Sequence, residues 1–569
     1  MILKICNLKK IIIKKIKKLE SAKYINIYTI AIFLFSCFMF LPLVSNYIFG
    51  DDTLFHIANT HARGINFSTI LSKILPLIGN DLGYGIGIFY PILPHMLSGF
   101  ILNIISHIGF GEYAAIKLVK FIGLFSAAIF MYLLGSKLFK DKKKGLLTSL
   151  FYISSSYFCT DFYSRDALNE SFIFIFMPLI FLGIYYLFCE KNKKLFYICF
   201  VIGYAGMMYS HLVMSVWFTI VFILFLLMFI KDIFKKENLL HLIIAAILIL
   251  IFTSPFTIPL IEHMLNGEYV VFNVESSVLT WTLDLKYFFV QIFQTTGGNN
   301  RLYVALNIIV ILLSIFTIYK IIVKKVPDYR EKYIIGFLLF AVAGMILVSN
   351  DTFWYYTPDF LNNMQFPWRA ASFVAFGFSL LAAEGLDVFC NLFKKKFIWA
   401  PYLLIIFVVA SNVYYNMQNL QIVNHLPYRF NDGMGWSLEY LPMETLKKYE
   451  YFENRNPNKV ISSDKNVKIK VLNNDVPNIK FEINDIKKNT TLELPRLYYL
   501  GYKIVDEDGN NIEYFKNENG FVSIKISENG KYYVTYPGTE ANQIANVVCG
   551  VAIIICILIL IIKRKVVNS

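Results

Sequence analysis

The sequence predicts an all-α polytopic membrane protein of about twelve transmembrane helices, with an extracytoplasmic β-sandwich-like domain near the C-terminus. Of the 569 residues, 57% are hydrophobic and only 16% are charged. Apolar stretches of about 18 to 23 residues recur along most of the chain, and each is long enough to cross a bilayer as a helix. A single long polar stretch, residues 417–540, interrupts this pattern and alternates polar with apolar residues.

The apolar stretches define the predicted transmembrane domain, residues 27–416, and one further helix after the polar stretch. The first, 27–49, is too long for the core of a signal peptide and lacks a small-residue cleavage site, so we expect it to be retained. We place the spanning helices at residues 27–49, 116–139, 145–160, 168–188, 195–210, 212–230, 239–257, 302–320, 333–349, 369–388, 397–416 and 544–562.

The net charge of +15 indicates the orientation of the chain in the membrane. Residues 1–26 carry eight Lys and one Glu, and short basic runs at 140–144, 191–194, 324–325, 394–396 and 563–565 hold much of the remaining positive charge. Clusters of this kind are typical of cytoplasmic loops. We therefore expect a multi-pass protein of the cell membrane, with a basic cytoplasmic segment at 1–26, a helix with a basic cytoplasmic tail at 544–569, and both termini inside.

One apolar segment, residues 88–108, is left out of the predicted spans. Counting it would move the basic runs at 140–144, 394–396 and 563–565 to the outside, against the charge rule. It has Pro91 and Pro94 near its start, and His95 and His107 within it. We interpret it as an amphipathic helix lying on the outer surface, within a long outer loop at 50–115.

The polar stretch 417–540 predicts an extracytoplasmic antiparallel β-domain. Alternation marks strands at 466–472, 478–484, 497–504, 521–526 and 531–536, with turn signals at 508–511, 519–520 and 529–530. Its 16 Lys and Arg nearly balance its 17 Asp and Glu, which excludes the basic surface of a nucleic-acid-binding domain. All eight Cys lie in or beside apolar segments, so neither a disulfide framework nor a structural zinc site is indicated.

The most informative residues are Asp51 and Asp52, which follow the first span. Adjacent carboxylates at a bilayer boundary are costly to desolvate and therefore suggest an active site at the membrane surface. A partly desolvated carboxylate can accept a proton from an incoming hydroxyl. His56, one helical turn beyond Asp52, is placed to hydrogen-bond it or to share a metal with it. Capping of a following helix is the alternative role for a single Asp.

Arg165 and Glu170 lie at the outer ends of two spans. The guanidinium of Arg165 matches phosphate oxygens with a bidentate fork, although an interfacial Arg can equally reach lipid headgroups or pair with Asp161 or Asp166. Glu170 lies about one turn into its helix and needs a partner, for which Arg165 is the nearest candidate.

Two further outer junctions carry candidate substrate-binding residues. His211 separates two apolar segments, and a lone His there is more often an interfacial hydrogen-bonding residue than a ligand. In the run from Gln365 through Trp368 to Arg369, Trp can stack on a sugar and Arg can bind a phosphate, while the aromatic belt that anchors helices is equally consistent. The glycines at 83, 85 and 87 lack a preceding strand and a Walker lysine, so we interpret them as a flexible turn.

The chain has a short basic N-terminus, one span, a carboxylate pair that opens a long outer loop, a Pro-containing surface helix and then many further spans. The overall arrangement is similar to that of the GT-C membrane glycosyltransferases. The motifs resemble more closely those of the bacterial membrane proteins catalogued as 6-pyruvoyl-tetrahydropterin-synthase-related and their YfhO-like relatives, without implying pterin chemistry. They are Gly50-Asp51-Asp52-Thr53-Leu54-Phe55-His56, Phe89-Tyr90-Pro91, Tyr163-Ser164-Arg165-Asp166-Ala167-Leu168-Asn169-Glu170, Ser210-His211-Leu212 and Gln365-Phe366-Pro367-Trp368-Arg369.

The resemblance implies a GT-C fold and an inverting transfer of sugar from a polyprenyl-phosphate donor to an envelope glycan, lipid or polymer outside the cell. It implies a catalytic carboxylate in the first outer loop, which we assign to Asp52 with Asp51 and His56 in support. Relatives often carry His where this chain has Asp51, so the choice of base and any divalent metal stay open. The alternatives are a transporter or flippase of lipid-linked saccharides, whose polar residues would line the midplane, and a non-catalytic envelope assembly protein.

Overall fold

The computed structural model consists of two compact units. The first comprises residues 1–53, 117–245 and 276–426, and the second comprises 54–116, 246–275 and 427–569. The predicted basic segment up to residue 25 and the basic runs at 324–325 and 394–396 lie outside the described residues. The described residues are 26–45, 47–48, 50–76, 81–273, 278–290, 294–295, 301–323, 328–358, 365–393, 399–418, 420, 422–423, 438–486 and 489–568.

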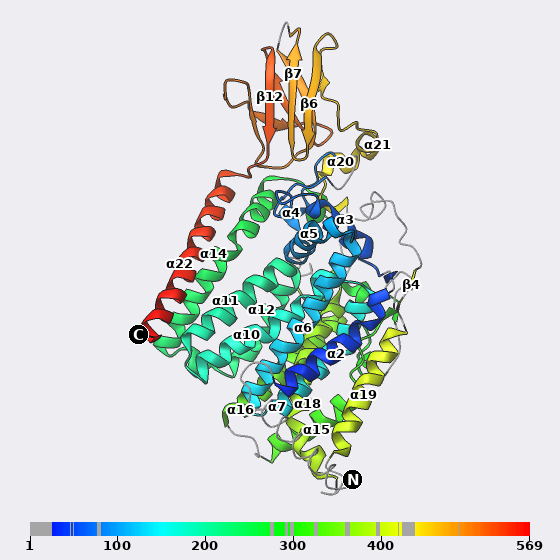
Figure 1. The fold of residues 1–569 in the computed structure, drawn as a ribbon, viewed down its shortest axis with the longest axis vertical. Helices are drawn as coiled ribbons and strands as arrows, with labels where there is room; N and C mark the ends of the chain where they lie inside the picture. The colour runs from blue at the N-terminus through cyan, green and yellow to red at the C-terminus, as the bar shows by residue number, and fades with distance from the viewer. Residues whose placement is uncertain are drawn as a thin grey trace. The chain divides into compact units, whose positions relative to one another are not determined.

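The first unit is a bundle of apolar helices (Figure 1). A two-stranded ladder pairs β1 (Tyr47–Ile48) with β4 (Ile422–Val423), and another pairs β2 (Gln294–Thr295) with β3 (Arg301–Leu302). The helices are α2 (Ile27–Ser45), α6 (Glu112–Phe139), α7 (Lys142–Ile153), α8 (Ser156–Cys159), α9 (Leu168–Ser171), α10 (Ile173–Phe188), α11 (Lys193–Ser210), α12 (Leu212–Leu227), α13 (Ile230–Ile233), α15 (Ile308–Ile322), α16 (Asp328–Ser349), α17 (Asp351–Tyr355), α18 (Ala371–Asn391) and α19 (Ala400–Met417).

Eight helices within the described residues are long and apolar enough to cross a membrane, which makes this a multi-pass membrane protein. Three shorter apolar helices, Leu93–Ile108, Leu212–Leu227 and Ile308–Ile322, add to them. The predicted total of about twelve spans stays a prediction. The predicted span 145–160 is broken at Ser154 and Ser155, between α7 and α8. The predicted helix at 302–320 begins only at Ile308, because the side chain of Asn307 caps it by accepting from the Ile309 amide.

Aromatic rings fill the centre of the bundle. The ring of Phe181 on α10 is fully buried, and its centroid lies 4.7 to 5.9 Å from six others on α12, α16 and α18. Edge-to-face pairs of this kind add to the stability gained from burial alone. The six are Phe218, Phe222, Phe225, Phe337, Phe340 and Phe376.

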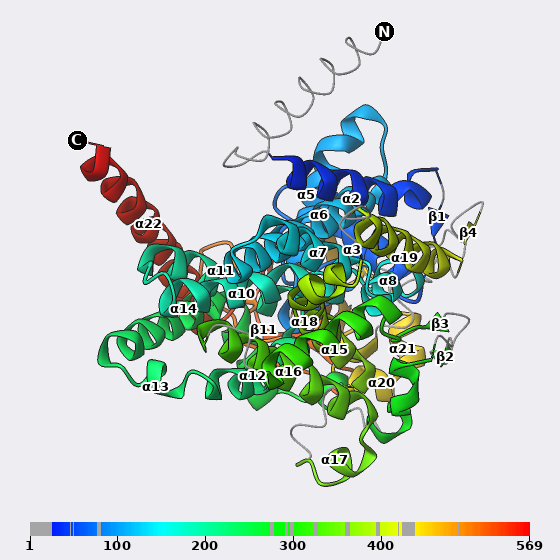
Figure 2. The same cartoon turned by 90° about the horizontal axis from the view of Figure 1, so that it is seen from below.

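Glycines on α18 allow its neighbours to approach closely. Helices α15, α16 and α18 lie next to one another in Figure 2. A Cβ at Gly377 would lie 2.7 Å from the carbonyl oxygen of Phe337 on α16. A Cβ at Gly385 would overlap the carbonyl oxygen of Leu313 on α15. Helices in membranes commonly pack through such small residues.

A buried ion network ties four helices at the end of α18 that lies away from Arg369. The carboxylate of Glu384 on α18 pairs with Lys144 of α7 at 3.1 Å, Lys320 of α15 at 2.5 Å and Arg330 of α16 at 3.2 Å. Glu384 is 1% exposed and Lys144 3%. Lys144 therefore lies inside the bundle, although the sequence groups it with a basic loop.

The second unit joins the first outer loop, the end of α14 (Lys236–Asn266) and the β-domain around one core. The ring of Phe89 from the loop stacks on that of Tyr440 at 5.5 Å, and Tyr269 stacks on Tyr499 at 5.7 Å. The Nε2 atom of His263 accepts a hydrogen bond from the Leu500 amide at 3.0 Å. Other helices here are α3 (Thr53–Gly64), α4 (Ile86–Phe89), α5 (Leu93–Ile105), α20 (Met443–Lys447), α21 (Tyr449–Glu453) and α22 (Glu540–Asn568).

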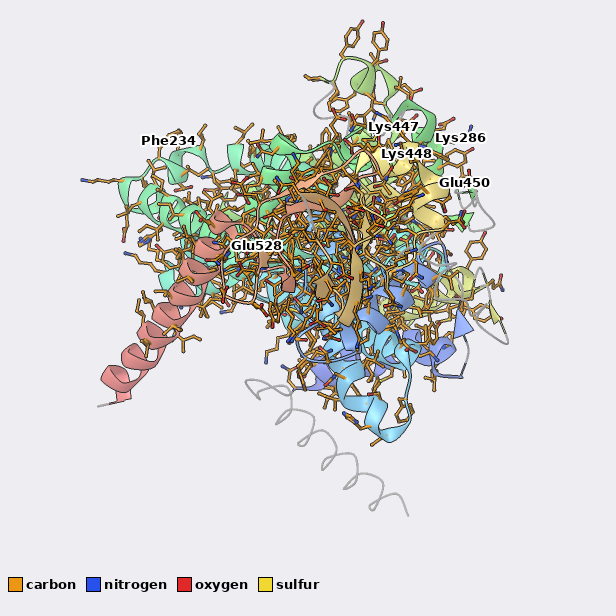
Figure 3. All side chains as sticks on the ribbon, turned by 90° about the horizontal axis from the view of Figure 1, so that it is seen from above. Phe234, Lys286, Lys447, Lys448, Glu450 and Glu528 are labelled. Atoms are coloured by element: carbon orange, nitrogen blue, oxygen red, sulfur yellow. The ribbon has the colours of Figure 1, made fainter. Side chains whose placement is uncertain are left out.

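The β-domain consists of two four-stranded antiparallel sheets, whose buried residues belong to one core. One sheet has the order β10-β11-β8-β5 and the other β6-β7-β12-β9; β6, β7 and β12 lie side by side in Figure 1. The exposed Lys447, Lys448 and Glu450 lie on and between α20 and α21 (Figure 3). The strands are β5 (Ile461–Ser462), β6 (Lys468–Asp475), β7 (Asn478–Asn484), β8 (Thr490–Leu497), β9 (Lys503–Val505), β10 (Tyr514–Lys516), β11 (Phe521–Ile526) and β12 (Gly530–Thr535).

Two local predictions in this unit were wrong. The predicted strand 497–504 is instead the end of β8 and the start of β9, separated by a turn at Gly501, whose φ is +105°. The glycines at 83, 85 and 87 are not a free turn but are buried, since a Cβ at Gly85 would lie 2.6 Å from the ring of Tyr499. The segment 88–108 contains α5, whose buried face carries His95, and its location on the outer surface stays a prediction.

The Pro255 carbonyl in α14 lacks its usual helical partner because Pro259 has no N–H. The ammonium of Lys73 donates to it at 2.8 Å and the side-chain amide of Asn542 on α22 at 3.2 Å. This shared carbonyl holds α22 beside the end of α14, where Figure 1 shows them.

Candidate functional site

Asp52 lies in a tight turn at the end of α2, packed against a second turn that carries Arg165. The Gly50 amide donates to the Thr53 hydroxyl at 2.7 Å, and the Asp52 amide donates to the Arg165 carbonyl at 3.1 Å. A Cβ at Gly50 would lie 2.6 Å from both the carbonyl carbon of Arg165 and the Cβ of Asp166. Only glycine therefore lets the two turns meet.

Arg165 is buried between two carboxylates. It follows a π-helical turn, η2 (Thr160–Ser164), and its Nη1 atom donates to Asp161 at 2.8 Å and to Glu170 at 2.9 Å. The Tyr157 hydroxyl donates to the other oxygen of Glu170. The prediction that Glu170 needs Arg165 as a partner matches this geometry. Of the two acids that the sequence offers to Arg165, Asp161 contacts it, whereas Asp166 pairs with Lys120.

Arg369 approaches the same carboxylate from the 3₁₀ turn η7 (Pro367–Ala370), which directly precedes α18. Its Nε atom lies 3.3 Å from Glu170 Oε2, and its Nη1 donates to the side chain of Gln365 at 3.1 Å. Two guanidinium groups thus converge on Glu170, and Gln365 orients one of them. The backbone of Gln365 is left-handed, with φ of +61°.

The ring of Trp368 is 3% exposed, stacks on Phe366 at 4.6 Å and meets the edge of Trp281 at 5.5 Å. A sugar could stack on it only if one of these rings moved. Its Nε1 atom is buried and has no hydrogen-bond partner.

Burial and neighbouring charges set the protonation of the acids outside the spans. Burial raises the pKa of Asp52 to about 6; the cations of Arg165 and Arg369 oppose this shift, and Glu170 adds to it. Part of Asp52 reaches solvent, while Asp51 is exposed. Burial, followed by the charge of Glu170, raises the pKa of Asp161 well above its usual value, and the cations of Arg165 and Arg369 oppose this shift.

His211 faces this cluster from the junction of α11 and α12. Burial, followed by the charge of Arg369, lowers its pKa to about 3, so the imidazole is neutral. Its Nδ1 accepts from the Met214 amide at 3.4 Å and caps α12, which assigns the ring proton to Nε2.

His56 belongs to the second unit. Its Nδ1 lies 2.8 Å from Nε2 of His95, with both rings buried. Its predicted support of Asp52 stays a prediction.

Sequence reasoning missed Lys120, Tyr157 and the role of Asp166. The ammonium of Lys120, buried within α6, donates to Asp166 at 2.6 Å. The signal was present, because a lysine inside an apolar span requires a partner. Among the described residues, no group of three or more His, Cys, Asp or Glu is arranged to hold a metal ion. The possible divalent metal thus has no ready-made ligand set in the described part of the chain.

A small cavity lies beside the cluster in the first unit. It is lined by Ser154, Ser155, Ser156 and Tyr157, by the segment 304–307 and by α18. Tyr157 connects it to Glu170 through the hydroxyl that donates to that carboxylate.

Comparisons with known proteins find a weak similarity to solved structures and none to a protein family or a curated sequence. No family model matches the chain, and no curated protein matches it. Solved structures of the oligosaccharyltransferase of the archaeon Archaeoglobus fulgidus are similar: a form tethered to an acceptor peptide (TM-score 0.44, 13% identity), the apo form (0.37, 14%) and a complex with an inhibitory peptide and a dolichol-phosphate (0.36, 13%). Each covers 76% of this chain, which spans 59 to 60% of theirs. At TM-scores below 0.5, we infer neither substrate nor mechanism from them.

Proposed function

We propose that this protein is a membrane glycosyltransferase that moves a sugar from a polyprenyl-phosphate-linked donor to a glycan, lipid or polymer acceptor of the cell envelope. The observation that supports this most directly is the placement of Asp52, a carboxylate with a pKa of about 6, against the turn that carries Arg165. A base with a pKa near the working pH is well matched to accept a proton from a hydroxyl.

The charge of the cluster favours an anionic phosphate. Arg165 and Arg369 bring two positive charges to the carboxylate of Glu170, and the raised pKa of Asp161 favours the neutral form of that second acid. Guanidinium groups bind phosphate oxygens well because their planar forks match the geometry of those oxygens.

The proposed step is a single inverting displacement. The acceptor oxygen bonds to the anomeric carbon of the sugar while the bond from that carbon to the phosphate oxygen breaks. The bonding electron pair leaves with the polyprenyl phosphate, whose added negative charge Arg165 and Arg369 stabilise. The acceptor proton moves to Asp52. His211, Gln365, Trp368 and His56 are proposed to contact or orient the substrates, and Asp51 to support Asp52.

In this proposal the site faces outside and both termini lie inside. Labelling of cysteines introduced at residues 51 and 566 by a membrane-impermeant thiol reagent, in a variant without the natural cysteines, tests the orientation. Label at 51 and not at 566 is expected. The reverse pattern would rule out an extracytoplasmic site.

The function is tested by transfer assays with the full chain in liposomes, using a panel of polyprenyl-phosphate sugars and envelope acceptors. We expect the Asp52→Asn variant to lose at least about a hundredfold in rate, the lower end of the effect of a general base. The Asp284→Asn variant is the matched control, because Asp284 is exposed on another loop of the same unit. The Asp51→Asn variant tests the choice between the two carboxylates, and a smaller loss is expected.

Two outcomes would contradict the proposal. A wild-type protein that moves the intact donor across the bilayer without cleaving its glycosidic bond would be a flippase. Full restoration of envelope glycans by Asp52→Asn, in a strain lacking the protein, would exclude Asp52 as the base and would favour an assembly role.

A further inference from the structure

Lys120 is a buried cation that lies outside the cluster of Arg165, Glu170 and Arg369. It is 5% exposed and lies two turns into α6, a helix long and apolar enough to span the membrane. Its ammonium donates to Asp166 Oδ1 at 2.6 Å and to the carbonyl of Phe162 at 2.7 Å. A charge in this setting requires a compensating partner, and Asp166 provides it.

Asp166 also contacts the turn that carries Asp52. Its second oxygen, Oδ2, accepts a hydrogen bond from the Thr53 hydroxyl at 2.6 Å. That hydroxyl in turn accepts from the Gly50 amide at 2.7 Å. A continuous chain of contacts therefore runs from the ammonium of Lys120 through a carboxylate and a hydroxyl to the backbone on both sides of Asp52.

The backbone of Asp166 supports this interpretation. Its φ of +54° is left-handed, a conformation that Asp enters more readily than most residues other than glycine but that still costs energy. In this conformation its carboxylate contacts both Lys120 and Thr53. The same conformation places the Arg165 carbonyl where the Asp52 amide reaches it, at 3.1 Å.

We propose that Lys120 is a positioning residue that acts through Asp166 and Thr53 to hold the backbone turn of Asp52 against the turn of Arg165. The inference rests on the proposed function for its consequence in catalysis. Its structural part, the ordering of residues 50–53 by Lys120, is independent of any reaction.

The test compares four variants of the full chain in liposomes. Thr53→Val removes the hydroxyl and keeps the shape, while Thr53→Ser restores the hydroxyl. Lys120→Met removes the cation. Lys137→Met is the matched control, since Lys137 lies on the same helix and loses an ion pair with Glu190 that is partly exposed.

Two quantities are measured: amide hydrogen exchange of the peptide covering 50–53, and the pH profile of transfer. Thr53→Val and Lys120→Met should speed exchange at 50–53 at least tenfold while exchange in α10 and α18 stays at the wild-type rate. Both should lower kcat about tenfold or more with a smaller change in KM, and both should displace the acidic midpoint of the profile. Thr53→Ser and Lys137→Met should resemble the wild type.

The outcomes separate the two claims. Wild-type exchange at 50–53 in both Thr53→Val and Lys120→Met would overturn the inference. If Lys120→Met fails to fold, the Thr53→Val and Thr53→Ser pair decides by the same measurement. If exchange responds as expected but the wild type transfers no sugar, the proposed function fails and the positioning of the turn stands.

Discussion

Transfer should depend on pH through Asp52, and the sign of this dependence follows from its surroundings. As a base, Asp52 must be deprotonated, so activity rises as the pH increases through its pKa of about 6. For that midpoint, the carboxylate makes up about nine-tenths of the population at pH 7 and about one-tenth at pH 5. The rate should therefore fall roughly tenfold between pH 7 and pH 5.

Two neighbouring residues should move this midpoint in opposite directions. Arg369 lowers the pKa of Asp52, so Arg369→Gln should move the acidic limb of kcat/KM to higher pH. Glu170 raises the same pKa, so Glu170→Gln should move the limb to lower pH. Arg369→Gln should also weaken donor binding, because it removes one of the two guanidinium groups proposed to bind the phosphate.

The assay is the initial rate of sugar transfer in liposomes between pH 4.5 and 8, with donor far below saturation. The Asp284→Asn variant serves as the control and should keep the wild-type profile. A rate that stays constant between pH 5 and pH 7 would refute the assignment of Asp52 as the base. Shifts of the same sign in Arg369→Gln and Glu170→Gln would refute the electrostatic account.

The remaining predictions concern packing and stability. Gly50→Ala should abolish transfer and cost about 1–3 kcal/mol of unfolding free energy, measured by thermal unfolding in detergent, because its Cβ would meet the turn of Arg165 at 2.6 Å. Glu384→Gln should cost about 3 kcal/mol in the same measurement, the lower end for loss of one partner of a buried ion pair, because Asp387 still pairs with Lys144 and Lys320; an unchanged midpoint would show that the network is not stabilising. Phe89→Ala should cost about 3–5 kcal/mol and speed proteolysis of the second unit, and resistance equal to the wild type would contradict its place in the shared core.

The sequence alone determined that the chain crosses the membrane several times and carries a β-rich domain near its C-terminus. Both conclusions follow from local periodicity, since a span needs about 20 apolar residues and an exposed strand alternates polar with apolar ones. Burial in a bilayer or against a sheet constrains the polarity of every residue in such a segment. The resulting apolar run or alternation therefore extends over many residues and is easy to detect. The ends of strands were predicted less accurately. At Gly501, a single glycine with positive φ forms a turn that separates β8 from β9 within one predicted strand.

The tertiary structure alone decided which charges meet. Asp52 and Arg165 are 113 positions apart, and Glu384 lies 240 positions from Lys144. A charged residue within an apolar segment indicates that it needs a partner of opposite charge. Which residue becomes that partner depends on which helices pack together. The pairing of Asp166 with Lys120 of α6 instead of the neighbouring Arg165 is one such case. The physical reason is that the free-energy cost of removing a charge from water depends on that residue alone, and so can be inferred from the sequence. The attraction that offsets this cost depends on the position of a second residue, which only the fold determines.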